Sequence, residues 1–546
     1  MSVFDFHCHP FFKHSVSAAD PRAINPLDEI LFNDQPIAMA FVGLSDFWDE
    51  ISDIDESLNS QSALPQLHRG GVSVLVNGIV GIEKGFAENA SIRLLSKISC
   101  RPAVAYLSQV VAGTLTYPQQ RDREIRIWQE ALDKEFADGI FLSAGKVGRP
   151  LRPQPNEIIS FLQFEGGHLL QDDALSPAEK LTEFKRSGIG KALITLNLCH
   201  LTEAGQGTRR LANFAYGMKL SKGSAFLPTG SGLTDDGRAV IDAAYTTDGP
   251  GGLEHRVLID LKHLSLISRR QLVAYREAKG YTAPLVCTHG GLTGMSLKDY
   301  AQTLWRGPDV NVQGTQAASL FCYAATASVD TGALTWFNPW TINLFDEEVE
   351  DILRSGGLFG ISLDQRILGF GPKTVNGTPI QVAETFSTAE LPEIAALLAP
   401  AGLRTTAPDF ARIPEICIPP VDAVGATQSR ATLQLNQFGL HICHVLALAA
   451  RLSAREGLAI DGWDHLCIGS DYDGLIDPIA DAINAAQLPH LKAALAARLP
   501  EIWQIYIRAR PEAAPFDLLG DIPANLEKLF SINGIRFLED EGVWWG

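Results

Sequence analysis

The chain is short of positive charge and has no cluster of cysteines. Its 546 residues include 45 lysines and arginines against 63 aspartates and glutamates, which gives a formal net charge of −18. A chain this acidic is not expected to bind nucleic acid through a basic surface. Its eight cysteines form no C-x-x-C pair, which argues against zinc ribbons and thioredoxin-like redox motifs.

Long hydrophobic runs are also missing. No stretch approaches the ~18 apolar residues of a membrane span, and the longest apolar run, residues 441–452, fits a buried amphipathic helix. The beginning of the sequence, MSVFDFHCHPFF, lacks a basic segment followed by an apolar one, so no secretory signal is expected. These absences predict a cytoplasmic protein with reduced thiols that binds neither nucleic acid nor membrane.

Eight short β-rich segments stand out, and segments with a helical pattern alternate with them. This alternation is typical of βα units around a parallel sheet, and eight such units predict an α/β fold of the closed (β/α)8 type, a TIM barrel. The expected strands are residues 3–9, 71–80, 158–165, 192–198, 256–263, 284–289, 357–363 and 465–471.

Two connections are much longer than a βα unit requires. Residues 290–356 follow the sixth expected strand and residues 364–464 follow the seventh. Because loops of this length are usually functional, we expect both to form a lid or small subdomain at the C-terminal face of the barrel. Pro419 and Pro420 fit a turn within the second insertion, so residues 1–546 are predicted to form a single domain.

Start signals mark several of the expected helices. Ser176, Pro177 and Glu179 combine a capping side chain, a proline in the first turn and an acidic residue near the helix start. Ser268 and Asp346 precede similar segments. The glycine-rich residues 230–237 lack the lysine of a phosphate-binding loop and fit a turn before a helix.

Two histidines lie two residues apart at the end of the first expected strand. His7 and His9 project from the same face as Asp5, because side chains at positions i and i+2 of a strand do so. Both imidazoles could therefore bind one metal ion. The alternative is a pair of buried, hydrogen-bonded histidines. Cys8 points to the opposite face and is assigned to packing.

Other potential ligands end other strands. Glu165 closes an otherwise apolar strand, where it fits either a carboxylate that bridges two metal ions or a solvated strand end. His263 and His289 end the fifth and sixth expected strands, whose carboxyl ends are neighbours in a barrel. Because imidazole and carboxylate are the usual ligands of a catalytic Zn²⁺, these residues together with His7 and His9 indicate a metal site.

Two aspartates follow the apolar part of the last expected strand. Asp471 follows it directly and is the better candidate for carrying protons beside a metal ion. Asp473 precedes a glycine and suits a turn equally well. Four aromatic residues of the first insertion could line a substrate pocket or form the insertion's own small core: Trp305, Trp336, Phe337 and Trp340.

In their order along the chain, these segments resemble the membrane (renal) dipeptidase family of zinc metallopeptidases within the amidohydrolase-type barrels. The likeness is carried by FHCH at 6–9, QFEGGHLL at 163–170, GLTDDGRAV at 232–240, LIDLKHLS at 258–265, THGG at 288–291, SGGLFGISL at 355–363, IGSDYDG at 468–474 and NLEKLFSINGIRFL at 525–538.

The resemblance implies an enzyme with two divalent metal ions, zinc in the family, and a small dipeptide or amide substrate. It implies that His7 and His9 bind one ion and that His263 and His289 bind the other. Glu165 would bridge the two ions, and a homodimer stays open. With Asp471 beside them, the expected metal ligands are His7, His9, Glu165, His263, His289 and Asp471.

Three positions depart from the family pattern. His9 stands where the family has an aspartate. The substrate-contacting histidine of the family aligns with Leu198, and we assign its role to His200, which a continuing strand would place on the same face. Ile342 stands where the family has an arginine that holds the substrate carboxylate, a loss of about 1.5–3 kcal/mol for a free dipeptide.

The sequence therefore predicts a binuclear metal-dependent hydrolase that cleaves an amide or peptide bond of a small substrate, with dipeptidase as the activity the family implies. Its expected catalytic residues are Glu165, His200 and Asp471. The alternative is another amide or cyclic-amide hydrolase, which His9 and Ile342 favour. A degenerate barrel that only binds is the non-enzymatic alternative, and the complete ligand set argues against it.

Overall fold

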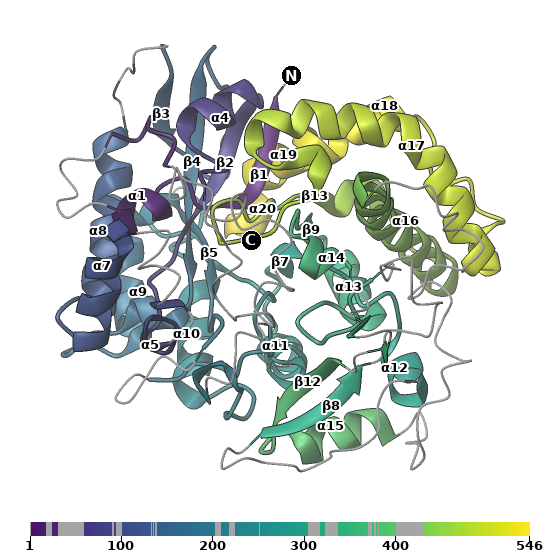
Figure 1. Cartoon of the computed structure of the whole chain (residues 1–546), viewed down its shortest axis with the longest axis horizontal. Helices are drawn as coiled ribbons and strands as arrows, with labels where there is room; N and C mark the ends of the chain where they lie inside the picture. The colour runs from purple at the N-terminus through teal and green to yellow at the C-terminus, as the bar shows by residue number, and fades with distance from the viewer. Residues whose placement is uncertain are drawn as a thin grey trace.

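A computed structural model gives the arrangement of most of the chain (Figure 1). It describes residues 2–17, 25–30, 59–89, 92–93, 101–132, 134, 136, 139–202, 209–217, 224–250, 252–303, 317–322, 337–369, 374–375, 378–379, 382–399 and 430–545. Four residues named above lie outside these ranges: Trp305, Trp336, Pro419 and Pro420.

Eight parallel strands form a barrel in which neighbours in sequence are neighbours in space. Their order is β6-β5-β4-β2-β1-β13-β9-β7, and a parallel bridge between Asp260, just after β6, and Val286 of β7 closes the ring. The predicted (β/α)8 barrel is confirmed. Each predicted segment overlaps one of its strands, and two strands extend one residue beyond their segments, β4 at its start and β7 at its end: β1 (Val3–Cys8), β2 (Val72–Ile79), β4 (Glu157–Glu165), β5 (Leu193–Asn197), β6 (Leu258–Ile259), β7 (Val286–Gly290), β9 (Leu358–Ile361) and β13 (Leu466–Ile468).

One strand of the sheet was not predicted. β3 (Phe141–Ala144) pairs in parallel with the beginning of β4, whereas the end of β4 pairs with β5. β3 has only four residues, and it pairs with residues 157–160 of β4 rather than with the end of β4 that carries Glu165. Its short, weakly patterned sequence, FLSA, does not distinguish it from a loop.

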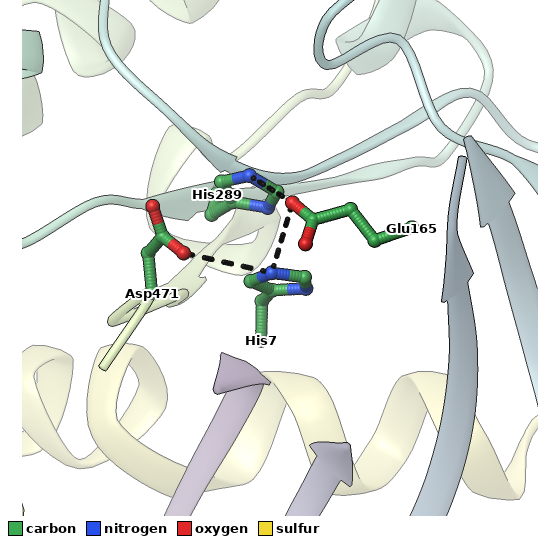
Figure 2. A group of neighbouring side chains, drawn as sticks. All are labelled: His7, Glu165, His289 and Asp471. Carbon is green, nitrogen blue, oxygen red and sulfur yellow. Dashed lines mark ion pairs between the residues drawn. The ribbon is translucent and has the colours of Figure 1, made fainter. Parts of the chain in front are cut away.

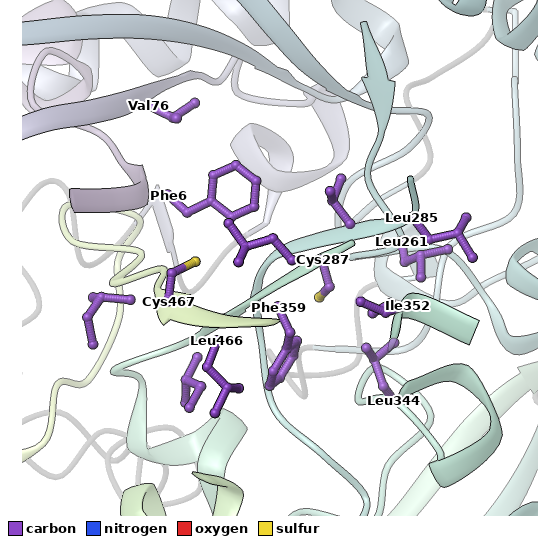
Figure 3. Close-up of a cluster of buried hydrophobic side chains, with 14 of the residues drawn as sticks. Phe6, Val76, Leu261, Leu285, Cys287, Leu344, Ile352, Phe359, Leu466 and Cys467 are labelled. Atoms are coloured by element: carbon purple, nitrogen blue, oxygen red, sulfur yellow. The ribbon is translucent and has the colours of Figure 1, made fainter. Parts of the chain in front are cut away.

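Alternation along the strands separates an apolar outer face from a polar inner one. On β1, Phe4 and Phe6 are buried, and the ring of Phe6 lies 6.1 Å from that of Phe537 in α19 (Asn533–Glu539). Figure 3 shows Phe6 among buried side chains of neighbouring strands, including Cys287, Phe359 and Cys467. Because Phe6 packs on Phe537 and Phe4 on Gly534, both in α19, the alternate positions of β1 face the barrel interior.

Local signals explain where the helices begin. The Ser176 side chain accepts a hydrogen bond from the N–H of Glu179 at the start of α9 (Pro177–Arg186), as predicted. The predicted start at Ser268 is wrong by several residues, because Ser265 is the cap of α11 (Leu266–Lys279) and its side chain accepts from the N–H of Ser268. α13 (Asp346–Arg354) begins at Asp346 as expected.

The apolar run at 441–452 lies within α16 (Arg430–Glu456), which packs against α17 (Leu488–Ala509). Among the helices of the described residues, none is long and apolar enough to span a membrane.

The two insertions meet in a separate antiparallel sheet formed by β8 (Ala317–Cys322) and β12 (Val382–Ser387), which lies below α11 in Figure 1.

Candidate metal centre

Five imidazoles converge on the carboxylate of Glu165 at the C-terminal ends of the barrel strands. Figure 2 shows two of them, His7 and His289, directed at this carboxylate from different strands. The distances from the Nε2 atoms to the nearest Glu165 oxygen are 3.1 Å for His263, 3.2 Å for His9, 3.3 Å for His289, 3.4 Å for His7 and 3.7 Å for His200.

Asp471 joins this cluster from the end of β13. Its Oδ1 lies 3.7 Å from Nε2 of His7 and 3.5 Å from Nε2 of His9. Asp471 has a φ of 62° and His263 one of 70°, a left-handed conformation that is costly for residues with a side chain. The surrounding structure therefore holds both turns in place at the mouth of the barrel.

The second ring nitrogen of each of three histidines meets an acceptor. Because an oxygen accepts from Nδ1–H, these contacts orient the ring and direct Nε2 to the common centre, as the outer partners of metal-binding histidines do. The contacts are His7 Nδ1 with Gln163 Oε1 at 2.8 Å, His9 Nδ1 with the Gly78 carbonyl at 2.8 Å and His200 Nδ1 with Glu83 Oε1 at 2.9 Å.

The Nε2 atoms approach each other as closely as hydrogen-bonded groups. His7 and His9 are 2.9 Å apart at these atoms, and His263 and His289 are 3.1 Å apart. Two unprotonated ring nitrogens would repel at such distances unless a cation lay between or beside them. The buried Nδ1 of His263 has no hydrogen-bond partner in the described residues. This donor set fits divalent metal ions.

The charges at the site agree with this interpretation. Burial alone would raise the pKa of Glu165, but the charges of His200 and His7 outweigh burial and hold that pKa well below its usual range. Burial lowers the pKa of His263 to about 3 and also lowers that of His289. Burial also acts to lower the pKa of His9 and His200, but the charges of Glu165 and Asp471 raise that of His9 to about 9, and the charges of Glu83 and Glu165 raise that of His200 to about 9. The site therefore presents an ionised carboxylate and, at His263 and His289, neutral imidazoles, the forms in which these groups bind metals.

Two groups of side chains could each hold one ion. In each group, one potential ligand atom per residue lies within 4.8 Å of all the others. The first group comprises His7, Glu165, His289 and Asp471, and the second comprises Glu165, His200 and His263. Glu165 is common to both groups. The structure thus places His289 beside His7, with ring centroids 3.8 Å apart, as well as beside His263.

Asp473 lies outside the cluster and has a different environment. Its carboxylate pairs with the buried Lys13 at 2.8 Å and accepts hydrogen bonds from the N–H groups of Gln61 and Ser62. The hydroxyl of Ser62 donates to it as well, at 2.6 Å. These contacts occupy both oxygens, so Asp473 ties the β13 turn to the segment before β2.

The sequence did not reveal the outer partners of the histidines. Gln163 could have been found, because it precedes Glu165 by two residues on β4 and shares its face. A glycine is required at position 78 because the rings of His7 and His9 lie against its backbone. A Cβ there would lie 2.6 Å from Cε1 of His9 and 2.8 Å from Cε1 of His7. Glu83 lies in a loop, and no pattern in the sequence points to it.

Ile342 is buried close to Leu201, the residue that follows His200. A Cβ at Gly217 would lie 2.3 Å from Ile342 Cδ1 and 3.3 Å from Leu201 Cδ2, so both side chains pack against this glycine. Arg366, a cation in the second insertion, pairs with Asp364 at 2.8 Å and donates to the carbonyl of Leu475.

The fold and the cluster together define a (β/α)8 barrel with candidate metal ligands at the C-terminal ends of its strands. A search with models of protein families and a search of curated proteins found no match.

Solved structures that resemble the chain include a dipeptidase described as a metallopeptidase of family M19 (16% identity, TM-score 0.40, 100% of this chain and 99% of that one). A metallopeptidase from Rhodobacter sphaeroides, liganded with a phosphinate mimic of the dipeptide L-Ala-D-Ala, has the same identity and TM-score over 99% of both chains. An amidohydrolase from Pseudomonas aeruginosa matches at 11% identity and a TM-score of 0.36, over 88% of this chain and 92% of that one.

Proposed function

We propose that the protein is a binuclear metal-dependent hydrolase that cleaves an amide or peptide bond of a small substrate in the cytoplasm, as a dipeptidase does. One observation carries the proposal: the buried carboxylate of Glu165 is surrounded by five imidazoles whose Nε2 atoms face it at the C-terminal ends of barrel strands. In (β/α)8 enzymes this end of the barrel carries the active site.

The proposed ligands share Glu165 between two ions. Two divalent ions, with zinc as the expected metal, would supply Lewis acidity toward the amide carbonyl and an activated water. Their ligands would be His7, His9, Glu165, His263, His289 and Asp471.

Asp471 is suited to the proton transfers of such a reaction. Its side chain is 15% exposed, against 4% for Glu165, so substrate and water can reach it. Its Oδ1 lies within 3.7 Å of two of the imidazoles. We assign to Asp471 the uptake of a proton from the attacking water and its transfer to the leaving amine. His200 would contact the substrate.

The long insertions are proposed to cover this site within a single domain. Glu390, in the second insertion, accepts a hydrogen bond from the hydroxyl of Ser265 at 2.6 Å, two residues after His263. Asn343, in the first insertion, donates to the carbonyl of Ile367 in the second at 2.8 Å. These contacts support a lid whose two parts are joined to each other and to the mouth of the barrel.

A second candidate is an amide or cyclic-amide hydrolase with a substrate other than a dipeptide. The apolar Ile342, which lies close to Leu201 next to His200, favours this second candidate, because an isoleucine cannot pair with a substrate carboxylate. The test is a hydrolysis panel of free dipeptides, their C-terminal amides and cyclic amides, run before and after removal of metal by a chelator. We expect hydrolysis of at least one class and its loss with the metal. Turnover that is unaffected by metal removal would refute the proposal.

A further inference from the structure

Glu83 is a buried carboxylate to which the proposed reaction assigns no part. It lies between β2 and α5 (Lys84–Glu88), and its side chain is 3% exposed. Its Oε1 receives two hydrogen bonds, from Nδ1–H of His200 at 2.9 Å and from the N–H of Leu201 at 3.1 Å. One oxygen therefore fixes both the imidazole of His200 and the backbone that follows it.

The hydrogen bond between Glu83 and His200 determines which ring nitrogen of His200 faces Glu165. With Nδ1 bound to Glu83, Nε2 is the free nitrogen, and it lies 3.7 Å from Oε1 of Glu165. The ring stands edge-on to that of His263, with centroids 4.6 Å apart. A rotation of the ring by half a turn would replace Nδ1 by a carbon and break the contact with Glu83, so the orientation is strongly preferred.

His200 is also the imidazole that a substrate would reach first. Its side chain is 12% exposed, whereas those of the other four histidines are at most 5% exposed. Its Nε2 is farther from Glu165 than theirs. Asp471 is the other accessible member of the cluster, and it contacts His7 and His9 rather than His200. The two accessible groups thus belong to different parts of the cluster.

We propose that Glu83 is a positioning residue that holds His200 with Nε2 toward the reacting amide of the substrate. The inference rests on the proposed hydrolase function and adds to it the residue that fixes the substrate contact. Loss of this support should weaken binding of the transition state while leaving the metal ligands in place, because Glu83 accepts its hydrogen bonds from His200 and Leu201, neither of which is a proposed metal ligand.

The test compares Glu83→Ala, Glu83→Gln, His200→Gln and the double variant Glu83→Ala/His200→Gln. Glu254→Gln is the matched control, since Glu254 is also a buried carboxylate and pairs with Arg186 instead of a site residue. Measurements on the metal-loaded protein are kcat and KM for the best substrate, metal content, thermal unfolding, and calorimetric affinity for a phosphinic analogue of a dipeptide, which mimics the tetrahedral transition state.

We expect Glu83→Ala to lower kcat/KM and the affinity for the analogue by ~10- to 100-fold, with metal content unchanged. Glu83→Gln should retain most of the kcat/KM and most of the affinity for the analogue, because the glutamine amide oxygen can still accept a hydrogen bond from Nδ1–H of His200. In the His200→Gln background, Glu83→Ala should cause no further loss, as expected for two residues that act as a unit. Glu254→Gln should leave both quantities unchanged.

Additive losses in the double variant, or full activity of Glu83→Ala, would overturn the inference. Loss of metal from both Glu83→Ala and His200→Gln would overturn it too, because His200 would then be a ligand. If the wild-type protein bound the analogue but hydrolysed no amide, the proposed function would fail. The affinities of the variants for the analogue would still test whether Glu83 positions His200. A wild-type protein that neither bound nor hydrolysed would refute both.

Discussion

The backbone N–H of Asp471 donates to the carbonyl of His7 at 2.8 Å, which joins the end of the last barrel strand to the end of the first. The same contact brings the Asp471 carboxylate within 3.7 Å of the His7 ring. A residue from the beginning of the chain and one from near its end therefore meet in the cluster because β1 pairs with β13 in the barrel.

Replacing Asp471 by asparagine should remove the proton carrier without disturbing the fold. We expect Asp471→Asn to lower kcat by ~10²-fold or more, as for a lost general base, and to change the free energy of unfolding little, because the side chain is partly exposed. Steady-state kinetics and urea unfolding measure the two effects.

Asp473→Asn provides the contrast. It breaks a buried ion pair with Lys13, and we expect a loss of about 3–5 kcal/mol in the free energy of unfolding. At a temperature where this variant stays folded, its kcat should be close to that of the wild type. A silent Asp471→Asn combined with an inactive but stable Asp473→Asn would reverse the assignment.

Gly78→Ala should displace the rings of His7 and His9. The new Cβ would lie 2.6–2.8 Å from their Cε1 atoms, closer than carbon atoms approach. We expect at least a ~10-fold loss of metal affinity, measured by competition with a chromophoric chelator. Gly188→Ala is the control, because a Cβ at Gly188 meets no atom within 4 Å. Equal metal affinities in both variants would contradict the predicted ligand geometry.

Ile342→Arg should shift substrate preference toward free acids. The wild-type protein should prefer C-terminal amides or other neutral acyl groups, and the new guanidinium should raise kcat/KM for a free dipeptide relative to its amide by ~10-fold or more. Ile342→Gln controls for polarity without charge. A strong wild-type preference for the free acid that Ile342→Arg leaves unchanged would show that another cation holds the carboxylate.

His255 should make the fold sensitive to acid. Burial lowers the pKa of His255 from 6.5 to about 4, and its Nε2–H donates to the carbonyl of Leu193 at 2.7 Å. Between these two pH values the unfolded chain binds a proton that the folded protein does not, so stability falls as the pH falls from about 6.5 toward 4. The contribution is at most about 3 kcal/mol.

His255→Gln should reduce this pH dependence. The glutamine amide can donate to Leu193 but does not titrate, so the free energy of unfolding should fall less between pH 7 and pH 5 than in the wild type. Urea unfolding of both proteins at pH 7 and pH 5 measures this change in the free energy of unfolding. Parallel pH dependences of the two proteins would contradict the assignment.

Strand ends were predictable from the sequence because their signal is local. An apolar run followed by a histidine or an acidic residue, as at His289 and Asp471, marks both the strand and its functional end. The eight strands of the barrel follow from such runs, and so does the convergence of the predicted ligands, since parallel strands in a barrel end at one mouth.

Contacts between distant segments were not predictable in this way. Glu83 meets His200 across 117 residues of sequence, and Gly78 meets His9 across 69. β8 and β12 likewise pair although they lie in different insertions. Such pairings depend on how loops pack in three dimensions, and the local sequence holds no period or cap that encodes them.

Metal content of the purified protein tests the central claim most directly. Elemental analysis should find about two divalent ions per chain in the wild type, because the four proposed imidazole ligands and Asp471 can serve two sites only if Glu165 is shared. Glu165→Gln should lose at least one ion together with hydrolytic activity. A wild-type protein with metal content near zero even after incubation with zinc, or a Glu165→Gln variant with full metal content and normal turnover, would contradict the account.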